Sequence, residues 1–161
     1  MPPSEPRILP TPAATVGESP VWDDLRGCLW WVDIRAPALH RSDPATGATR
    51  SWLMPEPVGS VALCRDGALL LALASGLHRF DPAGGVRALV ARCPGEPEGN
   101  RLNDGKASPE GRFLVGSMVD SGPRRPVGAL YRLDPGGACV PLLRGLTVPN
   151  GLAWSPDGRT L

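Results

Sequence analysis

One short pattern occurs four times along this chain of 161 residues. Each copy has a short apolar or mixed run, then a tight polar turn that ends in glycine, then a second apolar run. The copies begin GESPVWDD, VGSVALCRDG, RLNDGKASPEG and VPNGLAWSPDG, and their turns end at Gly27, Gly67, Gly111 and Gly158, spaced 40, 44 and 47 residues apart. A nearly constant period of this size indicates one structural unit repeated along the chain.

A second echo follows three of the copies. It reads ALHRSDP from Ala38, GLHRFDP from Gly76 and ALYRLDP from Ala129. The apolar runs are short, none has helical periodicity, and Pro and Gly stand in the turns between them. Strand–turn–strand followed by a strand and an Asp-Pro turn is typical of a β-propeller blade. A β-sandwich with coincidental spacing is the alternative, and the double echo disfavours it.

The repeats divide the chain into an N-terminal extension, residues 1–15, and a partial propeller domain, residues 16–161. The blades span roughly 16–57, 58–100 and 101–147, and residues 148–161 begin an incomplete fourth blade. A closed propeller has at least four blades, so we expect this chain to be part of a larger propeller. An open array would expose apolar faces and strand edges, and self-association of the chain could cover them.

Composition excludes several classes of partner. The chain has 17 Lys and Arg against 16 Asp and Glu, a net charge of +1, so we expect neither nucleic acid nor a membrane surface as a partner. No apolar run is long enough for a signal peptide or a membrane span. The four cysteines are scattered without a CxxC pair, which favours reduced thiols and a cytoplasmic protein.

Candidate site residues follow from the repeat register. Eight residues before the turn glycine lie Asn150, Asn103 and Gly59, and nine before it in the first copy, whose turn is longer, lies Glu18. If this position opens the innermost strand of each blade, Glu18, Asn103 and Asn150 converge at the channel mouth. One carboxylate and two amide oxygens suit a divalent cation such as Ca²⁺, Mg²⁺ or Mn²⁺, and Zn²⁺ less naturally. Gly59 would leave room for a ligand.

Two more polar residues are candidates on the same side. Arg101 lies two residues before Asn103 on a predicted strand, so it is expected to point the same way and to hold a carboxylate or a polyhydroxylated substrate. Asp120 follows the next strand, where it could face the channel. Simpler interpretations stay open: the asparagines as turn residues, Glu18 and Arg101 as surface charges, and Asp120 as a loop acid. Signatures such as HExxH, GxSxG and a phosphate-binding loop are missing from the sequence.

The segments GESPVWDDLRGCLWWVDI, RLNDGKASPEGRFLVGSM, GALYRLDP and VPNGLAWSPDGRTL resemble the gluconolactonase/regucalcin (senescence marker protein) family. The resemblance implies a six-bladed propeller that uses one divalent cation to hydrolyse sugar lactones to aldonic acids. It assigns Glu18 and Asn150 to the metal, and Arg101 and Asn103 to the substrate. Asp120 and Ser121 stand where the family often has an acid that binds sugar hydroxyls. The family's remaining metal ligand, an aspartate thought to act as general base, is expected beyond Leu161.

The sequence therefore predicts a metal-dependent sugar lactonase of carbohydrate metabolism, impaired if the chain ends where this sequence does. Ca, Zn, Mn and Mg are all possible as the cation. A non-catalytic calcium- or sugar-binding propeller, a protein-interaction propeller, and a hydrolase acting on another ester or an organophosphate remain alternatives.

Overall fold

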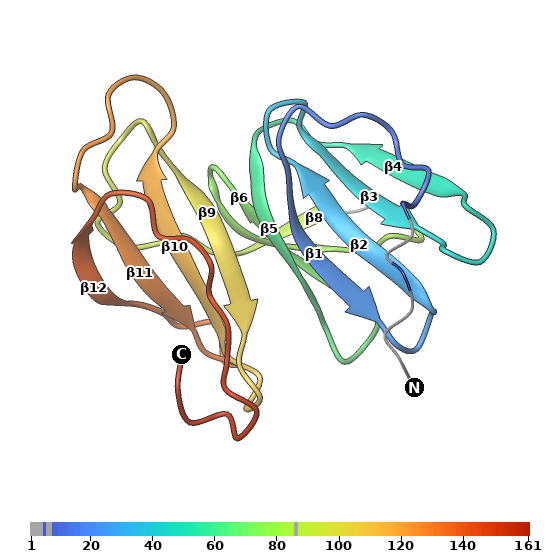
Figure 1. The fold of residues 1–161 in the computed structure, drawn as a ribbon. Coiled ribbons are helices and arrows are strands. Elements are labelled where there is room, and N and C mark those ends of the chain that lie inside the picture. The colour runs from blue at the N-terminus through green and yellow to red at the C-terminus, as the bar shows by residue number, and fades with distance from the viewer. Residues whose placement is uncertain (1–4, 6–7, 86) are drawn as a thin grey trace.

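The computed structural model describes residues 5, 8–85 and 87–161. Within these residues the only regular structure is β-strand, arranged as three separate four-stranded antiparallel sheets (Figure 1). No described residue belongs to a helix that is long and apolar enough to cross a membrane.

Each sheet is a meander in which every strand pairs with the next one along the chain. Short turns make this order possible, and Gly67 and Gly111 adopt positive φ angles of 87° and 84° that other residues resist. Sheet 1 contains β1 (Gly17–Asp23), β2 (Cys28–Asp33), β3 (Ala38–Ser42) and β4 (Thr49–Leu53). Sheet 2 contains β5 (Val58–Leu63), β6 (Leu69–Leu73), β7 (Gly76–Phe80) and β8 (Arg87–Ala91). Sheet 3 contains β9 (Asn100–Ala107), β10 (Phe113–Val119), β11 (Gly128–Leu133) and β12 (Cys139–Leu146).

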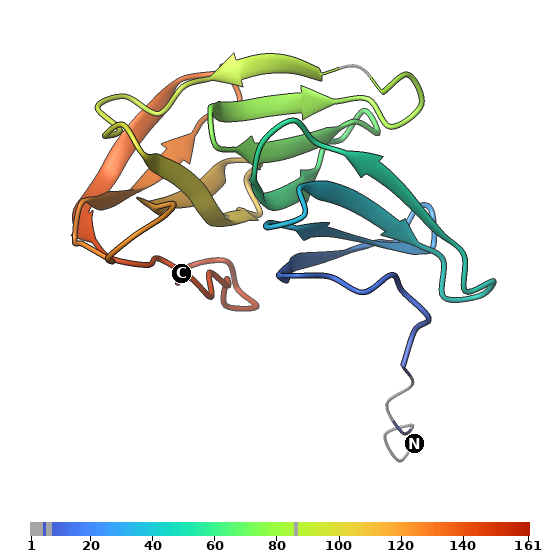
Figure 2. The same ribbon diagram turned by 90° about the horizontal axis from the view of Figure 1, so that it is seen from above.

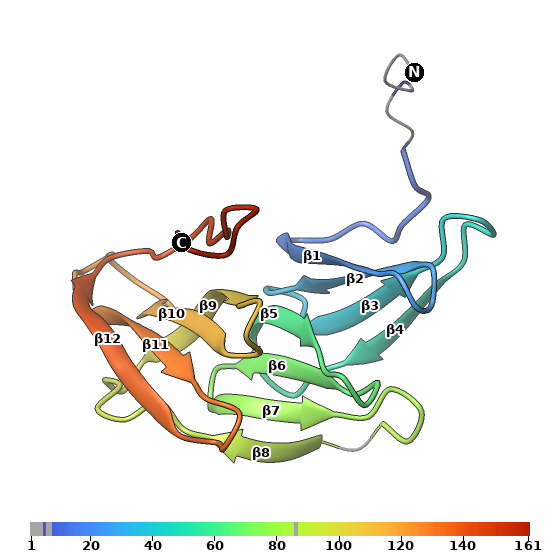
Figure 3. The same ribbon diagram turned by 90° about the horizontal axis from the view of Figure 1, so that it is seen from below.

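The three sheets stand side by side in an arc, as blades do in a propeller (Figures 2 and 3). The first strand of each sheet is its inner edge, and β5 contacts both β1 and β9. The all-β, partial-propeller prediction is therefore confirmed: the chain contains three blades.

Apolar side chains fill the two interfaces between neighbouring sheets. Between sheets 1 and 2 the core includes Trp30, Leu39, Val58, Leu71 and Phe80. Between sheets 2 and 3 it includes Leu77, Leu102, Val115 and Tyr131. Complete burial of each such side chain contributes about 1.5–3 kcal/mol to stability, so the blades stabilise one another through these contacts.

After β12, the segment of residues 147–161 contains no strand. It lies on the open side of the arc, between sheet 3 and β1 (Figures 2 and 3). The Leu152 amide donates to Asp104 Oδ2 at 2.9 Å, which holds the segment against β9. The Ser-Pro-Asp-Gly turn forms, since Gly158 N donates to Ser155 O at 2.8 Å. The predicted beginning of a fourth blade is thus present as a turn without paired strands.

Candidate functional site

A β-bulge interrupts the inner strand of every sheet near its beginning. In β1 the pairing with β2 skips from Glu18 to Val21, and in β5 the pairing with β6 skips from Val58 to Ser60. In β9 the break falls between Leu102 and Gly105, at Asn103 and Asp104. The bulges coincide with the positions that the repeat register selects. Because bulges re-aim side chains and occur often beside functional sites, this mouth of the arc is the candidate site.

Glu18 is an exposed residue that pairs with Val32 directly before the bulge of β1. Ser19, which follows it, is the one non-glycine residue with a positive φ, 53°, among those the structure describes. Its Oγ accepts a hydrogen bond from the Val61 amide of β5 at 3.0 Å, and this contact between sheets supports the strained backbone. The Glu18 carboxylate makes no hydrogen bond or ion pair with any described residue, so both of its oxygens are available to a ligand.

Gly59 does not leave the space that the sequence suggested. A Cβ at this position would lie 2.5 Å from Leu102 O and 2.6 Å from Asn103 O. The backbone of β9 fills the room beside Gly59, and Ser60 Oγ donates to Asn103 O at 2.9 Å. Glycine is needed here for the close packing of β5 on β9, and the expectation of a ligand-sized gap is wrong.

Arg101 and Asn103 form the buried part of the site. The two residues are 5% and 7% exposed, and Arg101 Nη1 donates to Asn103 Oδ1 at 2.7 Å. The two side chains therefore lie on the same side of β9. Asn103 Nδ2 donates to Pro149 O at 2.9 Å, so this amide joins sheet 3 to the segment that carries Asn150. Asn103 Oδ1 retains a lone pair for a further contact.

Asp120, in the loop after β10, is the counter-charge of the buried arginine. Arg101 Nε lies 2.9 Å from Asp120 Oδ1 as an ion pair, without a well-directed hydrogen bond. Burial lowers the pKa of Arg101 and the charge of Asp120 opposes that shift. Arg101 remains charged, because a guanidinium group is not deprotonated in proteins. The site thus contains a fixed cation and a fixed anion side by side.

Arg35, from the loop between β2 and β3, completes this cluster and had no signal in the sequence. Its Nη1 lies 3.1 Å from Asp120 Oδ1 and its Nη2 donates to Asp120 O at 2.7 Å. The contact bridges sheets 1 and 3 over 85 residues of chain. Asp33, two residues earlier, orders the start of that loop by accepting hydrogen bonds from the Arg35 and Ala36 amides at 3.0 and 3.1 Å.

Arg101 contacts both Asn103 and Asp120 directly, whereas no hydrogen bond or ion pair among the described residues joins Glu18 or Asn150 to these three. Asn150 is exposed and makes no hydrogen bond with the described residues. It adjoins Pro149, the partner of Asn103. Three hydrogen bonds connect the region of Glu18 to that of Asn150. They join Ser19 to β5, Ser60 of β5 to Asn103, and Asn103 to Pro149.

The oxygen atoms that could bind a metal at this site are the Glu18 carboxylate and the side-chain amide oxygens of Asn103 and Asn150. Within the part of the chain that the structure describes, no group of three or more His, Cys, Asp and Glu could hold a metal ion. Glu18 and Asn150 are hard oxygen donors to which no described residue is hydrogen-bonded or ion-paired, and such donors fit a divalent cation of the Ca²⁺ or Mg²⁺ type as part of its ligand set.

Three blades around common inner strands, with a polar cluster at one end of their axis, define a partial β-propeller protein. Residues 16–161 match the model of the SMP-30/Gluconolactonase/LRE-like region. The chain belongs to this family.

The proteins similar to this chain include one named as a lactonase and one described as a calcium-binding protein. It is 38% identical over 150 residues to regucalcin of Xenopus laevis, covering 91% of this chain and 50% of that protein. It is 37% identical over 145 residues to 6-deoxy-6-sulfogluconolactonase of Pseudomonas putida, covering 89% and 49%. Among solved structures, a calcium-binding protein, regucalcin, from Agrobacterium tumefaciens matches with a TM-score of 0.84 at 32% identity, covering 92% and 50%. The chain spans about half the length of the curated relatives it matches.

Proposed function

We propose that this chain forms three blades of a divalent-metal-dependent hydrolase that opens sugar lactones to aldonic acids. Membership of the family supports this assignment, as does the likeness to 6-deoxy-6-sulfogluconolactonase. The observation that carries it is the cluster at the mouth of the arc in which buried Arg101 and Asn103 meet the partly exposed Asp120. A buried arginine and amide are suited to a small polar molecule with several oxygens.

Each residue of this chain has a distinct part in the proposed reaction. Arg101 and Asn103 orient the lactone ring and its hydroxyls, since their own mutual contacts already restrict their rotamers. Both arginine contacts to the Asp120 carboxylate fall on Oδ1, so Oδ2 is free to accept a hydrogen bond from a sugar hydroxyl. Glu18 and Asn150 would be the chain's ligands to the cation. When bound, a divalent cation polarises the lactone carbonyl and lowers the pKa of a bound water.

The experiment measures cation affinity and lactone hydrolysis separately. Calcium, manganese, magnesium and zinc are titrated into the chain by calorimetry, and gluconolactone hydrolysis is followed by acid release with and without chelator. Glu18→Gln removes the charge and keeps the shape of the side chain, and we expect it to weaken cation binding at least tenfold. Glu110→Gln is the matched control, because Glu110 lies in the turn at the opposite end of β9.

Equal cation affinity in the parent chain and in Glu18→Gln would contradict the proposed metal ligand. The second candidate function is cation binding without catalysis. The similarity to the Agrobacterium regucalcin, which is described as a calcium-binding protein, favours this function. Cation binding that depends on Glu18, with no turnover across a panel of lactones, would select that function instead.

A further inference from the structure

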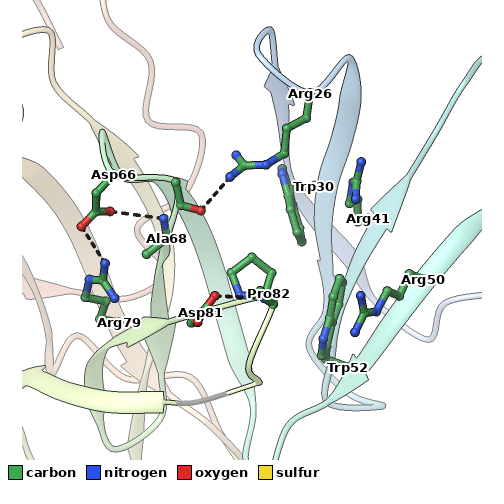
Figure 4. Close-up of a pocket in the computed structure, with 12 residues that line it drawn as sticks. Arg26, Trp30, Arg41, Arg50, Trp52, Asp66, Ala68, Arg79, Asp81 and Pro82 are labelled. Carbon is green, nitrogen blue, oxygen red and sulfur yellow. Dashed lines mark hydrogen bonds and ion pairs between the residues drawn. The ribbon is translucent and has the colours of Figure 1, made fainter.

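A second polar hollow lies between sheets 1 and 2, at the end of the inner strands opposite Glu18 and Gly59. The turns that join β1 to β2 and β5 to β6 border it, and its volume is about 450 Å³. Its lining includes four arginines and two tryptophans (Figure 4): Arg26, Arg41, Arg50, Arg79, Trp30 and Trp52. Both sheets that form it are complete in this chain.

Two of these arginines project from the core-facing side of sheet 1. Trp30 of β2 pairs in register with Arg41 of β3, and Arg41 pairs with Arg50 of β4. Paired residues of antiparallel strands point to the same face, and Trp30 packs into the core between sheets 1 and 2. Arg41 and Arg50 are therefore side by side at the open end of that interface. Like charges directly opposite each other destabilise a sheet.

The other two arginines of the hollow are neutralised within the protein. Arg26 Nη1 lies 2.8 Å from Asp23 Oδ2, and Arg79 Nη2 lies 2.6 Å from Asp66 Oδ2. Among the described residues, no carboxylate lies within 4.0 Å of the Arg41 or Arg50 guanidinium. Within the described residues, neither of these adjacent cations forms an ion pair, and the Asp43 carboxylate acts on Arg41 only from beyond 4.0 Å.

Aromatic contacts hold the two guanidinium groups in place. The Arg50 guanidinium carbon lies 4.6 Å from the centroid of the Trp52 ring, and that of Arg41 lies 6.0 Å from the centroid of Trp30. Arg41 Nε also donates to Cys28 Sγ at 3.2 Å. The Trp30 and Trp52 rings stack at 5.6 Å. Cation–π contacts orient each guanidinium and leave its N–H fork free for an anion.

The repeat supplies an internal comparison. Arg41, Arg79 and Arg132 occupy the same position of the Leu-His-Arg or Leu-Tyr-Arg echo. Arg79 is paired with Asp66, and Arg132 donates to Asp134 at 2.9 and 3.0 Å. Of these three described arginines, Arg41 alone forms no ion pair. Asp43 stands where sheet 3 has Asp134, but its Oδ1 accepts hydrogen bonds from the Ala45 and Thr46 amides and it acts on Arg41 only from beyond 4.0 Å. The equivalent position is neutralised in sheets 2 and 3, so the repeat itself does not require an unpaired arginine.

We propose that this hollow binds a small phosphate monoester of a polyol or sugar, with the phosphate between Arg41 and Arg50. A dianion there removes the repulsion between the two arginines and accepts charge-assisted, forked hydrogen bonds from both. The tryptophan faces are occupied by each other and by the arginines, so they favour no aromatic ligand. Across the hollow, the carboxylates of Asp66 and Asp81 suit hydroxyl groups on the body of the ligand.

Calorimetric titration with glucose 6-phosphate, glucose and inorganic phosphate tests this site. We expect the ester to bind at least tenfold more tightly than inorganic phosphate, and glucose not to bind. Arg41→Gln and Arg50→Gln should each weaken ester binding at least tenfold, and Arg50→Lys, which keeps the charge but loses the fork, should weaken it less. Arg132→Gln is the matched control and should bind like the parent chain. Equal affinity for inorganic phosphate, or unchanged binding in Arg41→Gln and Arg50→Gln, would overturn the proposal.

Thermal melts with and without ligand distinguish a binding site from a structural pair. Each substitution removes one of two repelling charges and also a cation–π contact, so the Tm of Arg41→Gln and of Arg50→Gln without ligand should stay close to that of the parent chain. A rise in Tm with glucose 6-phosphate that is as large in both variants as in the parent chain would overturn the proposal. Glucose 6-phosphate should raise the Tm of the parent chain and not that of either variant. Glu18→Gln should leave ester binding unchanged, because Glu18 lies at the opposite end of β1 from the hollow. Binding of the phosphate ester therefore tests this proposal independently of the lactonase proposal.

Discussion

Replacing Gly59 by alanine tests the closest approach between two blades. The added Cβ would lie 2.5 Å from Leu102 O, 2.6 Å from Asn103 O and 2.8 Å from Asn103 Cα. All three atoms belong to the backbone of β9, so no side chain can rotate away and β5 must separate from β9. Overpacking in a rigid core costs about 1–3 kcal/mol, and we expect a loss of about 2–3 kcal/mol in the free energy of unfolding. For a chain of this size, that loss lowers the Tm by roughly 5–10 °C.

Urea denaturation followed by tryptophan fluorescence measures this difference, and Gly136→Ala is the control. A Cβ at Gly136 meets no atom within 4 Å, so that variant should lie within about 0.5 kcal/mol of the parent chain. Because the displaced strand carries Arg101 and Asn103, Gly59→Ala should also weaken ligand binding at the candidate site. A loss below about 0.5 kcal/mol for Gly59→Ala would refute the inferred packing of β5 on β9.

Three further predictions concern charge and redox state. Burial alone would raise the pKa of Asp33, but four backbone hydrogen bonds outweigh burial and lower it below its ordinary value of 3.8. The stability that this carboxylate contributes is therefore present above pH 3.8 and is lost as the pH falls through the folded-state pKa. In thermal melts, Asp33→Asn should have a lower Tm than the parent chain at neutral pH. The Tm of this variant should also fall less than that of the parent chain as the pH is lowered. The Cys93 and Cys139 sulfurs lie 3.7 Å apart and are separated by 46 residues of chain, so the oxidant diamide should crosslink them. The disulfide should raise the free energy of unfolding by about 4 kcal/mol, and dithiothreitol should reverse the gain. Diamide should leave the free energy of unfolding of Cys93→Ser unchanged. Asp120→Asn should lower the free energy of unfolding by about 1–3 kcal/mol in urea, because it leaves buried Arg101 without its anion, and an unchanged value would contradict that pairing.

The strands and turns were predictable because their causes are local. In the turn that ends at Gly111, the glycine amide donates to Ser108 O at 3.0 Å and the glycine itself has a φ of 84°. Residues adjacent in the sequence determine both features, and the same chemistry recurs in every repeat. The side-by-side orientation of Arg101 and Asn103 was predictable for the same reason, since it depends on strand geometry alone.

The contacts between blades were not predictable from the pattern. Arg35 reaches Asp120 across 85 residues, and its two neighbours in the chain give no indication of that partner. The register placed Gly59 correctly beside Asn103 but could not tell that backbone, rather than a ligand, fills the space. The bulge that follows Glu18 and the bulge at Asn103 are likewise visible only in the pairing of β1 with β2 and of β9 with β10.

The amino-acid sequence by itself determined the all-β blades, their order and the positions that share one end of the propeller, because hydrogen-bonded turns and alternating strands are short-range consequences of residue type. Only the tertiary structure decided which of those positions are buried, paired or open. It placed Asp120 against two arginines and left Arg41 and Arg50 adjacent, with neither forming an ion pair to a described residue. Such outcomes depend on how sheets distant in the chain pack against one another, and no local pattern of residues records that packing.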